Sequence, residues 1–288
     1  MRLCTYMSDG GPRAAAVRGR QYVDLNRADS SLPARMKELL ALGNDALRRA
    51  EAAVQRGEAF GPDGVRLLAP VPDPEKIICV GLNYADHAAE TGATVGDEPV
   101  IFNKFPTALR ADGDPIELPK LSSQVDYEAE LVAVIGRGGR HIPQQQALAH
   151  VAGYACGHDV SARDWQKGKP GGQWLLGKGF DSFAPLGPHL VTADEVGDAG
   201  NLRIALRLNG KTMQDSNTQQ LIFKIDQLVA YLSGVCTLSP GDLIYTGTPP
   251  GVGMARKPPV FLQPGDTVEV EIERIGVLTN PVIAERQG

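Results

Sequence analysis

Residues 126–136 read DYEAELVAVIG, and this stretch decides the fold class. After its acidic start the run is almost entirely Val, Leu, Ile and Ala, which is typical of a buried β-strand, and Gly136 ends it. Because side chains two residues apart on a strand point to the same face, we expect Glu128 and Glu130 to project together into a buried region. Two buried carboxylates are costly alone, so they need protons, a cationic partner or a metal ion.

The first quarter of the chain predicts a small α+β domain. Strands are expected over residues 1–25 around a Gly-Gly-Pro turn, and an apolar stripe predicts one or two helices over residues 34–57. Three prolines within five residues then form a connector. We therefore expect an N-terminal α+β domain over residues 1–70 and a main domain over residues 71–288.

The main domain consists of short apolar runs separated by Gly and Pro, which predicts strands joined by tight turns. Helices are expected only at residues 84–90 and 222–232. Because strands outnumber helices, the pattern favours a β-rich α+β sandwich or roll over a doubly wound sheet. The clearest expected strands are residues 76–80, 100–103, 128–135, 202–208, 243–246 and 267–272.

Composition excludes several classes of protein. The formal net charge is −5 and no long basic run occurs, so neither nucleic acid nor an anionic membrane is expected as a partner. The four cysteines are scattered without C-x-x-C spacing, which argues against a zinc site and against a disulfide framework. No signal-peptide pattern or membrane-spanning run is found, so a cytosolic setting is expected.

A third carboxylate, Asp159, follows a run of small residues and could join Glu128 and Glu130. Three carboxylates that converge from two strands suit a hard divalent cation, Mg²⁺ or Mn²⁺. From spacing alone, the alternative is equally strong: the two glutamates could line a solvated face or pair with Arg and Lys.

A possible acid–base pair lies in the first expected helix of the main domain. His87 and Glu90 are three residues apart and would share one helix face, where the carboxylate would orient the imidazole as a general base. The alternative is an incidental pair on a surface helix, which the spacing alone favours.

Cationic and loop residues complete the candidate site. Arg163 suits a bidentate grip on a carboxylate, and Lys178 could stabilise an oxyanion. The alternative is routine surface charge, which the sequence favours more for Lys167 and Lys169 than for Lys178. Residues 245–253 contain several glycines, but their two prolines cannot donate N–H bonds to a phosphate and no P-loop lysine follows. We interpret this segment as a rigid loop that lines a substrate.

Five motifs, in this order, make the chain resemble the fumarylacetoacetate hydrolase family over about residues 74–282. The similarity is greatest to short bacterial members and to the FAH-domain-containing-protein-2 type. The motifs are N-Y-x-x-H-x-x-E at residues 83–90, D-Y-E-x-E-L at 126–131, H-D-V-S-A-R-D-x-Q at 158–166, G-K-G-F-D at 177–181 and T-G-T-P-P-G-V-G at 246–253.

The resemblance implies a mixed β-sandwich roll, a homodimer, and a Mg²⁺ or Mn²⁺ ion. It also implies a role for each candidate residue, with the His–Glu dyad on a short helix that closes over the substrate. The implied roles are metal ligation by Glu128, Glu130 and Asp159, catalysis by His87, Glu90 and Lys178, and substrate contact by Arg163, Gln166 and Thr248.

The main functional hypothesis is a metal-dependent hydrolase that cleaves a C–C bond in a 2,4-diketo acid such as an acylpyruvate. His87, oriented by Glu90, would activate water, and Lys178 would stabilise the developing oxyanion. One alternative is oxaloacetate decarboxylation or tautomerisation, or isomerisation of a 2-hydroxy-dienoate, on the same platform. Another is a non-catalytic protein that binds a 2-oxo acid metabolite.

Overall fold

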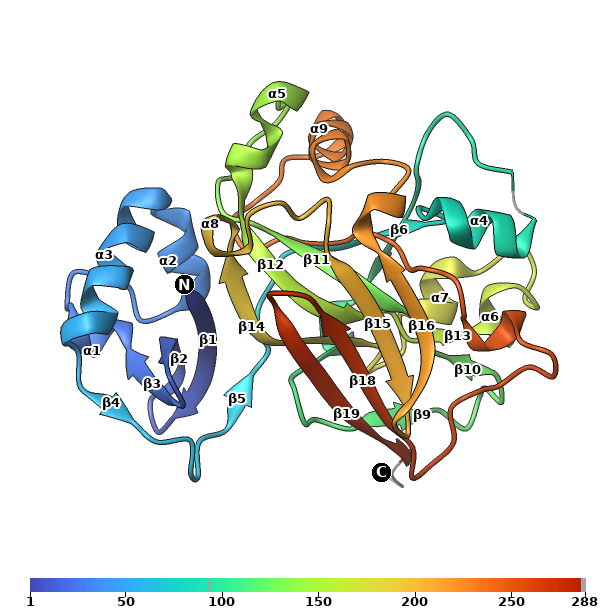
Figure 1. The fold of residues 1–288 in the computed structure, drawn as a ribbon, viewed down its shortest axis with the longest axis horizontal. Coiled ribbons are helices and arrows are strands. Elements are labelled where there is room, and N and C mark those ends of the chain that lie inside the picture. The colour runs from blue at the N-terminus through green and yellow to red at the C-terminus, as the bar shows by residue number, and fades with distance from the viewer. Residues whose placement is uncertain (93, 286–288) are drawn as a thin grey trace.

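The computed structural model describes residues 1–92 and 94–285 and is built around one twelve-stranded mixed sheet (Figure 1). Its strands are β1 (Arg2–Ser8), β2 (Gly11–Arg18), β3 (Gln21–Asp24), β4 (Ala59–Phe60), β5 (Leu67–Leu68), β6 (Ile77–Gly81), β7 (Val100–Lys104), β8 (Leu109–Arg110), β11 (Ala129–Ile135), β12 (Val151–His158), β14 (Ala184–Thr192) and β17 (Leu243–Tyr245). The main path runs β4-β3-β2-β1-β14-β12-β11-β17-β6-β7, with β5 on β1 and β8 on β14. Strand β7 therefore forms one edge.

A five-stranded sheet packs against one face of the large sheet and makes the sandwich. Its order is β16-β15-β18-β19-β9, and a separate pair joins β10 to β13. In Figure 1 this sheet lies in front of β11 and β12, and β11 and β12 both contact β18. The strands are β9 (Ile116–Leu118), β10 (Val125–Asp126), β13 (Ser161–Ala162), β15 (Arg203–Leu208), β16 (Lys211–Asn217), β18 (Thr267–Ile272) and β19 (Gly276–Ala284).

Strand β11 is buried on both faces, which is why its sequence is almost uniformly apolar. Leu131 and Ala133 join the core between the two sheets, whereas Val132 and Val134 join the core on the opposite face. Glu130 has the same parity as Val132 and therefore points to that opposite face.

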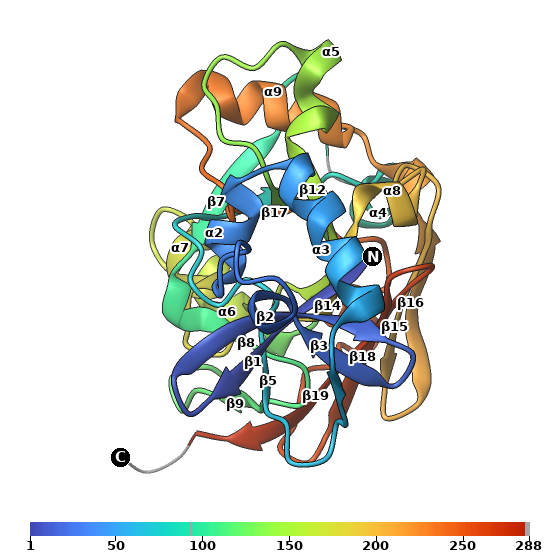
Figure 2. The same cartoon turned by 90° about the vertical axis from the view of Figure 1, so that its left-hand side faces the viewer.

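The helices lie around the sheets rather than between them. Helices α2 and α3 cover the N-terminal strands, on the side of the molecule nearest the viewer in Figure 2. No helix among the described residues is long and apolar enough to cross a membrane. The helices are α1 (Leu25–Ala28), α2 (Met36–Ala41), α3 (Asn44–Arg56), α4 (Ala85–Thr91), α5 (Gln144–Ala147), α6 (Arg163–Gln166), α7 (Trp174–Lys178), α8 (Ala193–Val196) and α9 (Ile225–Val235).

The N-terminal strands continue the large sheet, because β1 pairs with β14. One apolar core also holds residues from both parts, with Leu3 and Leu39 from the first and Leu186 and Tyr245 from the second. The domain boundary near residue 70 stays a prediction.

The expected β-rich α+β sandwich is confirmed, and so are all six clearest strands, within one or two residues. Four long strands of the main part, β12, β14, β16 and β19, have no counterpart among those six. Strands β14 and β19 contain prolines, which are rare inside strands, and β16 reads KTMQDSN, which lacks apolar alternation.

Candidate active site

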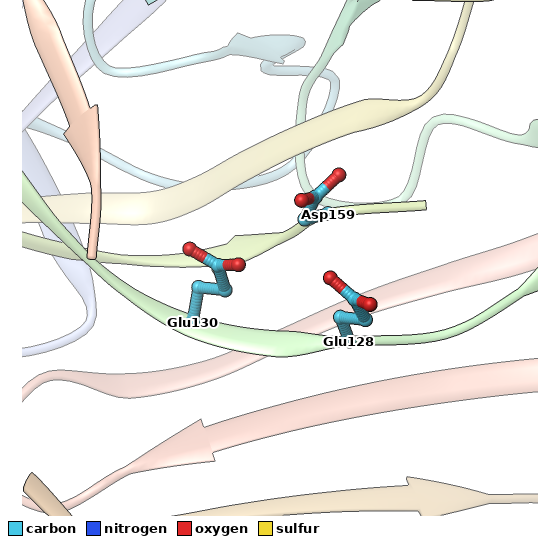
Figure 3. A group of neighbouring side chains, drawn as sticks. All are labelled: Glu128, Glu130 and Asp159. Atoms are coloured by element: carbon cyan, nitrogen blue, oxygen red, sulfur yellow. The ribbon is translucent and has the colours of Figure 1, made fainter. Parts of the chain in front are cut away.

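Three carboxylates meet at one point, as Figure 3 shows: Glu128 and Glu130 from the start of β11, and Asp159 from the end of β12. One ligand oxygen from each lies within 4.8 Å of the others, and all three residues are buried. The antiparallel register brings Ala129 opposite His158, and the Asp159 N–H donates to the Glu128 carbonyl at 2.9 Å. Backbone pairing therefore fixes the triad.

Two cations neutralise the Glu128 side of the triad. Lys178 Nζ donates to Glu128 Oε2 at 2.8 Å and to Asp159 Oδ2 at 2.6 Å. Arg163 donates to Glu128 Oε1 at 2.6 Å and to Asp126 Oδ2 at 2.8 Å. Burial alone would raise the pKa of Glu128, but the charges of Lys178 and Arg163 outweigh it and lower the pKa to about 2.

Among the described residues, no cation forms an ion pair with Glu130, and its side chain accepts one hydrogen bond, from the Gly247 N–H at 2.8 Å. Burial, and then repulsion from Asp159 and Glu128, raise its pKa well above the ordinary value for a glutamate. In the metal-free protein Glu130 therefore favours its protonated form, and its ionisation needs a further cation beside the triad.

A divalent cation fits this donor set. The buried cluster holds the four carboxylates of Asp126, Glu128, Glu130 and Asp159, against the three cations Lys104, Arg163 and Lys178. Carboxylate oxygens are the ligands that Mg²⁺ and Mn²⁺ prefer. With all four carboxylates ionised and a divalent ion bound, the cluster would carry a net charge of +1, which suits an anionic substrate.

Lys104 is a site residue that sequence reasoning missed. It ends β7, is fully buried, and donates to the main-chain oxygens of Val160, Lys178 and Phe183 at 3.0, 2.6 and 2.7 Å. Its Nζ also lies 2.7 Å from Asp159 Oδ1 as an ion pair. The sequence offers no signal for this, because Lys104 follows a half-exposed strand and belongs to no motif.

Asp126 was also missed, although it opens the D-Y-E-x-E-L motif at residues 126–131. Its carboxylate accepts hydrogen bonds from Arg163 Nε and from the N–H groups of Gly253 and Met254, at 2.8, 2.7 and 3.0 Å. It thereby anchors both Arg163 and the C-terminal loop. A buried acid two residues before the glutamate pair is the signal that could have revealed it.

Glu128 and Glu130 of the triad line a cavity of about 210 Å³. His87 lies on the cavity wall, and its Nδ1 is 3.0 Å from Glu90 Oε2. Glu90 in turn accepts a hydrogen bond from the Gly251 N–H at 3.0 Å. The dyad therefore faces the same space as the triad. The lining includes Val80, Leu82, His87, Phe102, Glu128, Glu130, Arg163, Gln166, Lys167, Trp174, Lys178, Thr248, Val252 and Met254.

The remaining predicted residues lie on this wall. Arg163 donates to Gln166 Oε1 at 2.9 Å, and Thr248 Oγ1 accepts from Gln214 Nε2 at 2.9 Å. Of the nine predicted residues, only Asp159 and Glu90 do not line the cavity; each contacts a residue that does.

Gly247 shows why the loop needs glycine. Its φ of 105° is unfavourable for other residues, and a Cβ at this position would lie 2.8 Å from the Asn83 Cβ. This close approach lets the Gly247 N–H reach Glu130. The loop therefore supports the triad through its backbone, in agreement with its interpretation as a rigid lining.

Comparison with protein families gives a match over most of the chain. The model described as fumarylacetoacetate (FAA) hydrolase C-terminal matches residues 76–283. Oxaloacetate tautomerase fahd2, mitochondrial, of Xenopus laevis is 49% identical over 288 residues, covering 98% of this chain and 90% of the relative. Oxaloacetate tautomerase FAHD2A, mitochondrial, of Homo sapiens is 49% identical over 266 residues, covering 92% of this chain and 85% of the relative.

Solved structures agree with this match. Fumarylacetoacetate hydrolase from Exiguobacterium antarcticum has a TM-score of 0.87 and 36% identity, covering 99% of each chain. Maleylpyruvate hydrolase from Sphingobium sp. SYK-6, in complex with manganese(II) and pyruvate, has a TM-score of 0.82 and 33% identity, covering 99% and 100%. The FAH-type fold is thereby confirmed, and the manganese complex together with the acidic triad supports divalent-metal binding.

The relatives correct one expectation. A cytosolic setting was inferred from scattered cysteines and the lack of a membrane segment, but both quoted tautomerases are named mitochondrial. The inference was wrong because unpaired cysteines fit any reducing compartment and do not tell one from another.

Proposed function

The chain belongs to the fumarylacetoacetate hydrolase family, and on that premise we propose that it catalyses keto–enol tautomerisation of a small 2-oxo acid, with oxaloacetate as substrate. One observation carries the proposal: His87, Lys178, Glu128 and Glu130 line one cavity of about 210 Å³, and Glu90 and Asp159 contact His87 and Lys178 directly behind them. Relatives of about half-identical sequence named oxaloacetate tautomerases favour this reaction over the hydrolysis first expected.

Tautomerisation moves one proton between the 2-oxygen and C3 of the substrate. His87 is the base and acid that this requires, because Glu90 fixes its Nδ1 and leaves Nε2 for the substrate. In the ketonising direction the enol O–H gives up its proton and C3 gains one, so no bond between carbons breaks. Lys178 contributes positive charge beside the 2-oxygen.

Glu128, Glu130 and Asp159 would hold Mg²⁺ or Mn²⁺. When bound, such an ion supplies Lewis-acid stabilisation of negative charge that develops on a substrate oxygen. The protein residues confine this chemistry to a buried site, where electrostatic interactions are stronger than in water.

The test is to mix enol oxaloacetate with the protein and Mg²⁺ or Mn²⁺ and to follow ketonisation by ultraviolet absorbance. We expect the wild-type protein to accelerate ketonisation beyond the rate with the metal ion alone. Glu130→Ala should lose both this acceleration and metal binding. His87→Ala should lose the acceleration but still bind the metal. No acceleration by the wild-type protein would overturn the proposal and leave a non-catalytic metabolite-binding protein as the better account. Pyruvate and CO₂ are measured separately to detect decarboxylation.

Hydrolysis of an acylpyruvate-type 2,4-diketo acid is the second candidate. The His87–Glu90 geometry also suits activation of a water molecule, and the similar Sphingobium protein is named a maleylpyruvate hydrolase. Metal-dependent release of pyruvate from acetylpyruvate would favour it. The two reactions share residues but differ in products, so one panel with both substrates distinguishes them.

We keep the homodimer as a proposal. The edge strand β7 exposes Val100 and Ile101, and Val235 of α9 lies exposed beside the same groove, which a second copy would cover. Light scattering during size-exclusion chromatography should give twice the chain mass. A monomeric mass at micromolar concentration would contradict it.

A further inference from the structure

We infer that Lys167 reads a second carboxylate on the substrate, so that the site selects dicarboxylic 2-oxo acids over monocarboxylic ones. This inference rests on the proposed function and names the substrate class of the same cavity. Lys167 follows α6, and its N–H donates to the Arg163 carbonyl at 2.9 Å. Its side chain is exposed to solvent and lines the cavity.

The other cations of the cavity wall are already engaged. Each guanidinium nitrogen of Arg163 donates to a protein acceptor, in Asp126, Gln166 or Glu128. Lys178 is held between two carboxylates. Among the described residues that line the cavity, Lys167 is the one cationic side chain without a hydrogen bond or ion pair.

Charge balance leads to the same residue. With a divalent ion, the buried cluster has one positive charge to offer, which one carboxylate of the substrate would neutralise. A second carboxylate in this small cavity then needs a cation from outside the cluster, because an unpaired buried charge is costly. Lys167, at the exposed side of the cavity wall, is placed to supply it.

The surroundings of Lys167 also favour an anion. Partial burial, and then repulsion from Arg163, lower the pKa of its ammonium group. A substrate carboxylate would offset that repulsion. Lys169, two residues further on, differs: its Nζ lies 4.6 Å from the centre of the Trp165 ring and it does not line the cavity.

The experiment compares pyruvate with oxaloacetate, which differ by one carboxylate. Binding to the Mn²⁺-loaded protein is read from quenching of tryptophan fluorescence in a stopped-flow instrument, since Trp174 lines the cavity. We expect Lys167→Gln to weaken oxaloacetate binding about tenfold, the worth of one charge-assisted hydrogen bond, and to leave pyruvate binding unchanged. Lys167→Arg should keep most of the selectivity.

Lys169→Gln is the matched control and should bind both acids as the wild-type protein does. Equal weakening of both acids by Lys167→Gln, or no effect on either, would overturn the inference. Because binding is measured without turnover, a wild-type protein that binds oxaloacetate selectively but does not tautomerise it would count against the proposed function alone. Failure of the wild-type protein to bind either acid would overturn both.

Discussion

At the scale of single residues, Glu130 is the least compensated charge in the site. Its neighbours Glu128 and Asp159 each contact a lysine, whereas Glu130 contacts only a backbone N–H. A buried carboxylate in this position is unfavourable until a cation arrives. The same side chain therefore opposes stability in the metal-free protein and favours metal binding.

Glu130→Gln should separate these two effects. Metal affinity should fall at least about 100-fold, because a ligand charge is lost, and calorimetric titration with Mn²⁺ measures it. The metal-free variant should melt no lower than the wild-type protein, since a neutral amide replaces a disfavoured carboxylate. Glu51→Gln, an exposed site far from the triad, is the control. A metal-free variant that melts well below the wild-type protein would contradict this account.

Lys104 differs from Glu130, because its buried charge is compensated by three main-chain oxygens and by Asp159. Lys104→Met would leave three main-chain oxygens and Asp159 short of a cation, so we expect a loss of about 3–5 kcal/mol in the free energy of unfolding. Urea denaturation measures it. The exposed Lys120→Met should cost far less. A loss below about 1 kcal/mol for Lys104→Met would show that Asp159 does not depend on this lysine.

These residues also show what a sequence can predict of a site. Glu128, Glu130 and Asp159 were predictable because strand periodicity and motif order place them together. Lys104 was not, because its role depends on the pairing of β7 with β6, which brings it beside elements about 55 to 80 residues away along the chain. The sequence also did not predict the hydrogen-bond partners of Arg163. This residue, which was expected to contact the substrate, donates hydrogen bonds to Asp126 and Glu128.

At the scale of elements, strand predictions succeeded where apolar residues form a continuous run or alternate with polar ones. Strand β11 has apolar neighbours on both faces, so its sequence alone identifies it. Strand β14 also lies inside the large sheet, between β1 and β12, yet it contains Pro185 and Pro188. Proline removes a ladder hydrogen bond, so the local sequence predicts a loop, and only pairing with both neighbours makes the strand.

His189, which lies in strand β14, should make the stability of the protein depend on pH. Burial, and then the charge of Arg2, lower the pKa of His189 to about 4, and its Nδ1 is buried without a partner. In the unfolded chain the His189 imidazole has a pKa near 6.5 and therefore binds a proton more tightly than in the folded protein. The stability that goes with a neutral His189 is present above about pH 6.5 and is lost as the pH falls toward 4. His189→Gln should make the melting temperature depend less on pH over that range. An unchanged pH slope would show that other groups cause it.

At the scale of the whole molecule, the N-terminal part and the main part share a sheet and a core. Pairing of β1 with β14 joins them, and the apolar cluster around Tyr245 contains side chains from both. The N-terminal helices and strands therefore cover one face of the sheet in which Glu130 lies at the start of β11. The proline-rich connector lies between β5 and β6, and its role as a boundary between two folding units stays a prediction.

The shared core predicts one cooperative unfolding transition for the full chain. Calorimetry should give equal calorimetric and van't Hoff enthalpies, because neither part can lose its structure without exposing the apolar face of the other. A fragment of residues 71–288 should lack a cooperative transition and should not bind Mn²⁺, since removal of β1 exposes β14 and uncovers Val132 and Val134. Two separate transitions in the full chain, or a folded fragment that binds Mn²⁺, would instead show that the division near residue 70 separates two independent domains.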